Sequence, residues 1–513
     1  MKNGLRKYIT PFLWILLVIG NLYKLILINA GFLTEPDEYR YMWSWQLLKK
    51  LHDGEFLPAL QSVFSADARP GAVLIHTIPA VLQFPFAEIM GYEIFETRSF
   101  AVVFVYNLVI HILVLWVFYK ILLLIFYDKN SALFGVLIFS VSVNHYAYLR
   151  HIYPYNESLL IFLFLIYRFT DRLLNRKKIR PADAFIWGAL AFAGILIYPA
   201  YYLSFIGVYL FFLWMIYRRK KLSNDFLKIN FAYFSGAVTV LFLTEIISGI
   251  AGISYIDHAL KLSGTVSQGS YKESFSFAIK YLFEVEKFTG LLLITGMLFF
   301  VIIMFIKKRP ATPRDEIIKF LSVSFFIAYL IHAVLGYFFS VMTMYGRILH
   351  QFIWVIILVS IYALRQVEKE KRIYLIYFFS VLIFVQFLWQ IHHYTRFSYP
   401  KDVYWKYLKS YPASRIIEIS EYEKAGSNIP PLEVNLYTNY DIRDTVILVN
   451  GFYFYPFDDS SKWHSYTPPP GYELIFKNLH FINFKAYQYE GYAIEERRLI
   501  DSIRPVIRMY KKK

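Results

Sequence analysis

The chain has 513 residues, of which 57% are hydrophobic and 20% aromatic. This composition excludes an ordinary soluble domain and is typical of a polytopic membrane protein. Lys and Arg outnumber Asp and Glu by 54 to 37, a formal net charge of +17. Most basic residues lie in short loops between apolar runs, so the excess indicates cytoplasmic loops and anionic lipid headgroups rather than nucleic acid. The absence of cysteine excludes disulfides, thiolate metal sites and a cysteine nucleophile.

The first apolar run, residues 8–29, is long enough to cross a bilayer. Basic residues precede it and no small-residue cleavage site follows it, which predicts an uncleaved first span with its N-terminus inside. Lys24 lies near the outer end of this run, where its long stem is expected to carry the ammonium group to the interface.

Three acids, Glu35, Asp37 and Glu38, follow where the chain leaves the membrane. Thr34 and Pro36 are typical of a helix start, and acids in a first turn stabilise the positive end of a helix. Capping explains one acid there but does not require three. Acids at a membrane face indicate a function, because burying their charge near lipid is costly.

Residues 31–95 are predicted to form one long outer loop with two interfacial helices. Apolar residues of 36–51 recur at helical spacing. Residues 71–89 are apolar but interrupted by two prolines. If they crossed the membrane, the very basic loop 175–180 would lie outside. If they lie flat on the outer face, that loop and the other strongly basic loops fall inside, as the charge rule requires.

With the first span, the later apolar runs give about eleven predicted transmembrane helices. These runs are residues 98–126, 131–149, 155–171, 183–198, 200–217, 228–249, 288–306, 317–340, 347–364 and 372–391. An odd number of spans places the C-terminus outside. Residues 250–287 form a second long outer loop that contains His258 and Lys261, and such loops usually cover or bind ligands.

After residue 391 the composition becomes mixed, which separates a soluble outer domain, 392–513, from a membrane domain, 1–391. Residues 445–449 and 481–487 are predicted to be strands, and residues 495–502 a short helix. The predicted fold is a mainly α, polytopic membrane protein with interfacial helices and a small C-terminal α/β domain.

The sequence Pro36-Asp37-Glu38 after a first span resembles the luminal acidic motif of the GT-C glycosyltransferases. Its nearest form is the His-Pro-Asp-Glu motif of the mannosyltransferases that build GPI anchors and lipid-linked oligosaccharides, with Glu35 here in place of histidine. The layout is also similar, with a long first outer loop, later outer loops and an outer C-terminal domain. The resemblance covers residues 8–391, and the outer domain matches in position alone.

The resemblance implies an inverting enzyme that moves a hexose or pentose, mannose being one candidate, from a polyprenyl-phosphate donor. The acceptor would be a glycan, lipid or protein at the outer face of a bacterial inner (plasma) membrane, on the periplasmic or extracellular side. An attacking acceptor hydroxyl must lose a proton, and a carboxylate in hydrogen-bond reach acts as general base. Asp37 is the first choice. Glu38 is the second, as base or as the residue that holds Asp37 or orients the acceptor, and Glu35 is the third.

Glu157 is the other candidate acid, at the outer start of the predicted span 155–171. Bacterial lipid-A aminoarabinose transferases and protein mannosyltransferases, to which the chain is similar, carry an acid in a comparable Pro-linked turn. Helix capping by Asn156 and Glu157 is the alternative interpretation.

Arg347 stands at the outer start of the span 347–364, in a stretch that resembles the Arg-Tyr motif of GT-C enzymes, whose arginine binds the lipid phosphate. Ile348 takes the place of the tyrosine. A guanidinium group is a planar, always charged fork that suits phosphate oxygens. Contact with lipid headgroups is the alternative role. Arg69 and His350 are further candidates for the phosphate.

Substrate contacts from the outer loops are assigned to Glu35, His258 and Lys261. The sequence has no Asp-x-Asp, Walker or His-Glu-x-x-His motif, so no metal site is predicted and no cofactor beyond the lipid-linked donor. Whether the reaction needs a divalent metal is not decided by the sequence. The alternative functions are an O-antigen polymerase or ligase and a lipid-linked glycan transporter or flippase. The first would place essential arginines in large outer loops, and the second would place charges at mid-membrane beside paired broken helices.

Overall fold

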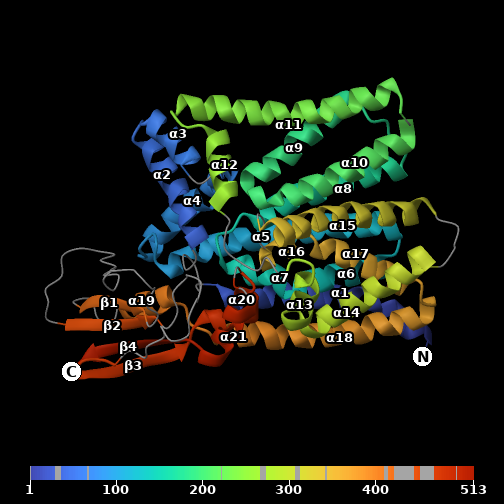
Figure 1. The fold of residues 1–513 in the computed structure, drawn as a ribbon. Coiled ribbons are helices and arrows are strands. Elements are labelled where there is room, and N and C mark those ends of the chain that lie inside the picture. The colour runs from blue at the N-terminus through green and yellow to red at the C-terminus, as the bar shows by residue number, and fades with distance from the viewer. Residues whose placement is uncertain are drawn as a thin grey trace.

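A computed structural model of the chain describes residues 2–28, 36–65, 69–220, 222–265, 273–306, 312–340, 344–408, 414–420, 444–450, 467–490, 492 and 494–513. Long helices dominate it, and a small sheet near the C-terminus lies beside one end of them (Figure 1). The helical content and the long apolar helices confirm the prediction of a mainly α, polytopic membrane protein.

The helices that follow the apolar runs are α1 (Lys2–Tyr23), α5 (Ala101–Phe126), α6 (Lys129–Val141), α7 (Val143–Tyr146), α8 (Tyr155–Leu174), α9 (Pro181–Ile197), α10 (Tyr202–Lys220), α11 (Asn224–Ile250), α14 (Lys287–Val301), α15 (Pro313–Phe339), α16 (Gly346–His350), α17 (Ile353–Arg365) and α18 (Lys369–Tyr394). Shorter pieces between them are η1 (Lys24–Leu27), η3 (Thr97–Phe100), η4 (Ala147–Arg150), η5 (Pro199–Tyr201), α12 (Tyr255–Thr265), α13 (Phe277–Glu284) and η6 (Ile302–Ile306).

Among the described helices, eight are long and apolar enough to cross a membrane. A ninth is added if α6 and the α7–η4 segment, which are bent by 60° relative to each other, form one span. Helices are the expected structure for these runs, because lipid offers a backbone N–H or C=O no hydrogen-bond partner.

The described residues of the predicted first outer loop are mostly helical. Its elements are η2 (Pro36–Arg40), α2 (Tyr41–His52), α3 (Phe56–Phe64) and α4 (Pro70–Met90). The helix predicted for residues 36–51 is confirmed from Tyr41 onward, whereas residues 36–40 form the 3-10 turn η2. The buried side of α2 consists of Tyr41, Ser44 and Leu47, spaced three residues apart. The predicted interfacial segment, residues 71–89, lies within α4, which packs against α2, α5 and α9. By length and apolarity alone, α4 is also one of the eight candidate spans.

One end of the long helices carries the basic loops, and ion pairs join these loops to one another. Arg218 at the end of α10 lies 2.9 Å from Glu316 at the start of α15. Arg372 at the start of α18 lies 3.4 Å from Asp128, which precedes α6. Arg314 of α15 lies over the ring of Tyr127, which follows α5, and Arg372 donates to the carbonyl of Arg365 at the end of α17. The ends of α5, α10 and α17 and the starts of α6, α15 and α18 therefore lie on one side of the bundle. We call this side the basic end.

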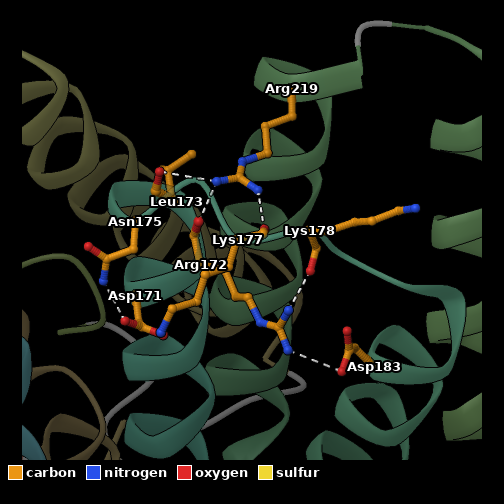
Figure 2. A network of polar contacts seen from close by, with 8 residues as sticks. All are labelled: Asp171, Arg172, Leu173, Asn175, Lys177, Lys178, Asp183 and Arg219. Carbon is orange, nitrogen blue, oxygen red and sulfur yellow. Dashed lines mark hydrogen bonds and ion pairs between the residues drawn. The ribbon is translucent and has the colours of Figure 1, made fainter.

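Figure 2 shows the polar network at the α8–α9 loop, which belongs to the basic end. Arg219 of α10 donates to the backbone carbonyls of Arg172, Leu173 and Lys177. Arg172 itself lies 3.2 Å from Asp183 in α9. A guanidinium group is favourable there, because the carbonyl groups at the end of α8 carry the negative pole of that helix. Contacts as well as charge therefore hold the basic loops together.

The described strands of the C-terminal domain form one four-stranded sheet in the order β1-β2-β4-β3. The strands are β1 (Ser414–Ser420), β2 (Asp444–Asn450), β3 (Tyr472–Leu479) and β4 (Val506–Lys512). β1 and β2 are parallel, and β4 is antiparallel to both of its neighbours. α19 (Pro400–Leu408) packs on the sheet through Val403. The strand predicted at 445–449 and the helix predicted at 495–502 are confirmed as β2 and α21 (Ile494–Ile503).

The strand predicted for residues 481–487 is wrong. This segment forms η8 (Phe481–Asn483) and α20 (Lys485–Gln488). Phe481, Phe484 and Tyr487 are spaced three residues apart, which suits a helical face better than the alternation of a strand. The rings of Phe484 and Tyr487 pack against Tyr394 at the end of α18, so packing on the membrane domain outweighs the β-propensity of the aromatic residues.

Lys24 does not reach the interface, contrary to the prediction. Its side chain is fully buried. The ammonium nitrogen lies 2.9 Å from Oδ1 of Asn21, 2.7 Å from Nε2 of His111 and 2.8 Å from Oγ of Ser140. A polar group buried among membrane helices finds its partners on neighbouring helices. Here α5 and α6 supply them, so the lysine joins three helices instead of reaching water.

Candidate functional site

The site is organised around the break between α7 and α8, at the end of the bundle opposite the basic end. η4 ends at Arg150, and the chain continues through residues 151–154 before α8 begins. Residues 141–159 are all buried. The polar side chains of this segment must therefore find partners inside the protein.

Several buried polar atoms of this segment have no hydrogen-bond partner among the described residues. They are Oγ of Ser142, Oδ1 of Asn144, Nε2 of His145, the hydroxyl of Tyr146, Nε and Nη2 of Arg150, and Oδ1 of Asn156. Leaving one such atom unpaired costs about 1–3 kcal/mol. Native proteins keep few of them, so their concentration in one short segment indicates a region that receives a polar ligand or water.

Glu38 in η2 is fully buried and joins the first outer loop to this segment. Its Oε2 lies 3.1 Å from Nδ1 of His151, and its Oε1 accepts a hydrogen bond from the backbone N–H of Ile152 at 3.0 Å. Both carboxylate oxygens therefore hold the turn before α8. Asp37 belongs to the same 3-10 turn, but its side chain, like the whole of Glu35, lies outside the described residues.

His151 also contacts the C-terminal domain and so links it to Glu38. Its Nδ1 faces the Glu38 carboxylate, and its Nε2 shares a hydrogen bond with the hydroxyl of Tyr487 at 2.5 Å. The Tyr487 hydroxyl in turn accepts from Tyr399 at 3.1 Å. Burial lowers the pKa of His151, although Glu38 raises it. The ring is therefore neutral at pH 7, and residues of the C-terminal domain complete the chain of hydrogen bonds.

Arg150 is held between two aromatic rings. Its Cζ lies 4.0 Å from the ring centroid of Tyr394 and 3.7 Å from that of Tyr399. The side chain is 1% exposed. A desolvated cation between two rings gains about 2 kcal/mol or more. Arg150 thus fixes the end of α18 and the start of the C-terminal domain against the turn before α8.

A small cleft opens beside this turn. It is lined by Arg40, Tyr41, Arg69, Ala72, Val73, His76, Ile152 and Pro154. Nε2 of His76 lies 3.6 Å from Oε1 of Glu157, and both side chains are almost fully buried. Glu157 does not cap α8, because the N-cap residue is Pro154 and no side chain caps this end. Arginines such as the two that line this cleft can bind phosphate, and a carboxylate such as Glu157, which lies behind His76, can accept a proton.

Three tyrosine rings connect the parts of the site. The rings of Tyr153 and Tyr155 are stacked with centroids 4.8 Å apart, and Tyr155 lies 4.8 Å from Tyr198. We call these three residues the tyrosine stack. Arg69 lies over Tyr198, with its Cζ 4.9 Å from the centroid. At the other end, Tyr153 stacks on His151 at 5.2 Å.

Arg347 reaches the tyrosine stack from α16. Its Nη1 donates to the hydroxyl of Tyr155 at 3.3 Å, and its Cζ lies 4.5 Å from the ring centroid of Tyr345. Its Nε lies 3.4 Å from Oε2 of Glu490, and its backbone N–H donates to Oε1 at 2.9 Å. The arginine predicted to bind phosphate is therefore at the site, where it holds a carboxylate from the C-terminal domain.

The structure thus places four of the predicted residues around the cleft and the tyrosine stack. These are Glu38, Glu157, Arg69 and Arg347. Each contacts the cleft or the stack directly or through one histidine. They come from η2, from the residue before α4, from α8 and from α16, so the site exists only where these elements meet.

The other predicted residues lie elsewhere. His350 is fully buried, and its ring nitrogens contact His145 at 3.0 Å and Tyr201 at 2.7 Å, which leaves neither nitrogen for a phosphate. His258 and Lys261 lie in α12, which packs against α11. The side chains of both form no hydrogen bond or ion pair with another described residue.

The sequence interpretation did not assign Arg40, His76, Tyr487 or Glu490 to the site. His76 had a visible signal, a polar residue within the apolar run that became α4. Glu490 had none, because it stands in the C-terminal domain, 143 residues from Arg347. Only the docking of that domain brings the two together.

Protein-family models, curated proteins and solved structures were compared with the chain, and none matches it. Within the described part of the chain, no three His, Cys, Asp or Glu side chains are grouped so that they could hold a metal ion.

Proposed function

We propose that the chain is an inverting membrane glycosyltransferase of the GT-C type. It transfers a sugar, with mannose as one candidate, from a polyprenyl-phosphate donor to a hydroxyl of a glycan, lipid or protein. The observation that carries the proposal is the meeting of the first-loop acidic turn, Glu157 and two arginines at one end of the bundle. A carboxylate for the acceptor proton and cations for the donor phosphate are what this transfer requires.

In the proposed reaction the acceptor oxygen attacks the anomeric carbon while a carboxylate takes its proton. The bond between that carbon and the phosphate oxygen breaks, and the sugar is transferred with inversion. Asp37 is assigned as the base, and Glu38 as the positioning residue that fixes η2 on His151. Glu157, which lies 3.6 Å from His76, is the alternative base.

The leaving group is polyprenyl phosphate, whose negative charge grows as the bond breaks. Arg69 at the cleft and Arg347 at the tyrosine stack are assigned to its oxygens. Preorganised cations are effective here, because they face the charge that develops in the transition state. A guanidinium group also gives two parallel hydrogen bonds to a phosphate.

We further propose that about eleven helices cross the membrane and that α4 does not. Thr10 in α1 bonds to Asn130 at the basic end, whereas Asn107 near the start of α5 donates to the carbonyl of His151 at the opposite end. The chain thus leaves α1 and enters α5 on one side. α2 and α3 are too short to cross. If α4 crossed, the chain would therefore enter α5 at the basic end and not at the opposite end.

The positive-inside rule then makes the basic end cytoplasmic. The cleft, the tyrosine stack and the C-terminal domain lie on the other side, which is the periplasmic or extracellular side of a bacterial inner membrane. The substrates fit this side, because a polyprenyl-phosphate sugar presents its headgroup at the membrane face.

The test is sugar transfer from a labelled polyprenyl-phosphate donor by purified protein. Loss of a general base costs about 10²- to 10⁴-fold in rate, whereas Asn caps a helix as well as Asp does. Asp37→Asn is therefore expected to lower kcat strongly while the protein stays folded. Glu38→Gln and Glu157→Gln are measured alongside. If Glu157→Gln alone is inactive, the base is Glu157, and if all three retain turnover, the proposed function is wrong.

A further inference from the structure

We infer that Arg347, its backbone N–H and the hydroxyl of Tyr148 form a cradle for the donor phosphate, and that the carboxylate of Glu490 fills this cradle between donors. The inference rests on the proposed function and deepens it. It gives the C-terminal domain a role in the reaction: its carboxylate must withdraw before a donor binds, and it takes the place of the phosphate product afterwards.

The first support is the set of donors around Glu490. Oε1 accepts from the backbone N–H of Arg347 at 2.9 Å and from the hydroxyl of Tyr148. Oε2 lies 3.4 Å from Nε of Arg347. The Glu490 side chain is 7% exposed. A guanidinium, a backbone N–H and a hydroxyl that converge on one buried anion are the donors that recur in phosphate sites.

The second support is Gly346, which stands beside the cradle. A Cβ atom at this position would lie 2.7 Å from Oε1 of Glu490 and 2.8 Å from the ring of Tyr281. The backbone carbonyl of Gly346 is fixed by Nδ2 of Asn144 at 2.9 Å. The missing side chain lets an anion approach the backbone closely. This space for an anion results from the missing side chain of Gly346 and does not depend on the charge of Arg347.

The C-terminal domain does not depend on Glu490 to stay docked. The backbone N–H of Gly346 donates to the carbonyl of Tyr489 at 2.8 Å. Arg497 of α21 pairs with Glu273 of the second outer loop at 2.6 Å. The exchange therefore needs a rotation of the Glu490 side chain and leaves the domain in place.

Competition within the cradle has a measurable consequence. A site that is open for only a fraction of the time binds its ligand more weakly by that fraction. Glu490→Gln removes the charge that Arg347 attracts, and Glu490→Asp keeps the charge but shortens its reach. Both substitutions open the cradle, so both are expected to bind a lipid phosphate about tenfold more tightly than the wild type.

The experiment is calorimetric titration of the purified full chain in lipid nanodiscs with farnesyl phosphate. Glu495→Gln is the matched control, because Glu495 is an exposed acid on the nearby helix α21. Arg347→Ala is made in the wild type and in Glu490→Gln. Melting temperatures establish that each variant is folded, and Glu490→Asp gives the answer if Glu490→Gln does not fold.

The inference requires tighter binding by both Glu490 variants, unchanged binding by the control, and loss of binding in both Arg347→Ala proteins. Equal or weaker binding by the Glu490 variants, with binding still lost in Arg347→Ala, would overturn the inference. It would show that Glu490 is a permanent structural partner of Arg347 and does not compete with the phosphate. The proposed function would survive that result. Binding that does not depend on Arg347 in any background would overturn the cradle, and the transfer assay with Asp37→Asn then decides the function separately.

Discussion

Nδ1 of His151 lies 3.1 Å from Oε2 of Glu38, and both side chains are fully buried. The contact fixes the acidic turn of the first outer loop on the turn before α8. On its other side the same histidine bonds to Tyr487 of the C-terminal domain. One imidazole ring therefore links the acidic turn, the turn before α8 and the C-terminal domain.

Removal of the Glu38 side chain should destabilise the protein. Glu38→Ala leaves the backbone N–H of Ile152 and Nδ1 of His151 without their partner, which is expected to cost about 1–3 kcal/mol. Glu38→Gln keeps an acceptor and should cost less. Thermal unfolding in detergent measures both, with Glu55→Ala, at an exposed acid of the same loop, as the control. Equal melting temperatures for Glu38→Ala and the control would contradict a stabilising contact between Glu38 and the turn before α8.

Replacement of Arg347 by lysine should weaken the use of donor although the charge is kept. Lysine is a point charge and cannot hold the hydroxyl of Tyr155 and a phosphate oxygen with one planar fork. We expect the KM for the donor to rise about tenfold in Arg347→Lys, and further in Arg347→Ala. Arg176→Lys, at the basic end, should change nothing. An unchanged donor KM in Arg347→Ala would remove this residue from the site.

Reporter fusions should place the residues that follow α4 and the residues that follow α8 in different compartments. A fusion after Gly91 is expected to report the outside, because α4 begins and ends on the side of the cleft. A fusion after Arg180 should report the cytoplasm, since this loop belongs to the basic end. A cytoplasmic signal after Gly91 would show that α4 crosses the membrane.

Acid should loosen the C-terminal domain through His480. Burial lowers the pKa of His480 to about 3, and its Nδ1 accepts from the backbone N–H of Ile482 at 3.2 Å. In the unfolded chain a histidine titrates near about 6.5. As the pH falls below that value, the unfolded state binds the proton first, so stability decreases by up to about 1.4 kcal/mol per pH unit until the folded pKa is reached.

The measurement is the melting temperature at about pH 7.5 and about pH 5. Asn accepts a hydrogen bond without titrating, so the melting temperature of His480→Asn should fall less between the two values than that of the wild type. His52→Asn, at an exposed histidine, serves as the control. If His480→Asn and the wild type lose the same number of degrees, His480 is not the group that titrates.

The sequence by itself determined where the helices lie and on which side the basic loops gather. Apolar runs of membrane length have one way to satisfy their backbone groups in lipid, which is a helix. The periodicity of residues 36–51 predicted α2, and the position of Glu38 after the first apolar run singled out an acid that the structure buries. These properties depend on residues that are close together in the chain, so they can be predicted from the local sequence pattern.

Only the tertiary structure decided which of these residues meet. Glu490 and Arg347 are 143 residues apart, and Tyr487 reaches His151 from a segment whose aromatic residues predicted a strand. Lys24 finds His111 and Ser140 on two other helices and does not reach water. No local pattern marks such pairs, because the contact depends on how helices pack against one another and on where the C-terminal domain docks. The free energy of pairing a buried charge is set by that packing, and it arises only when the whole chain has folded.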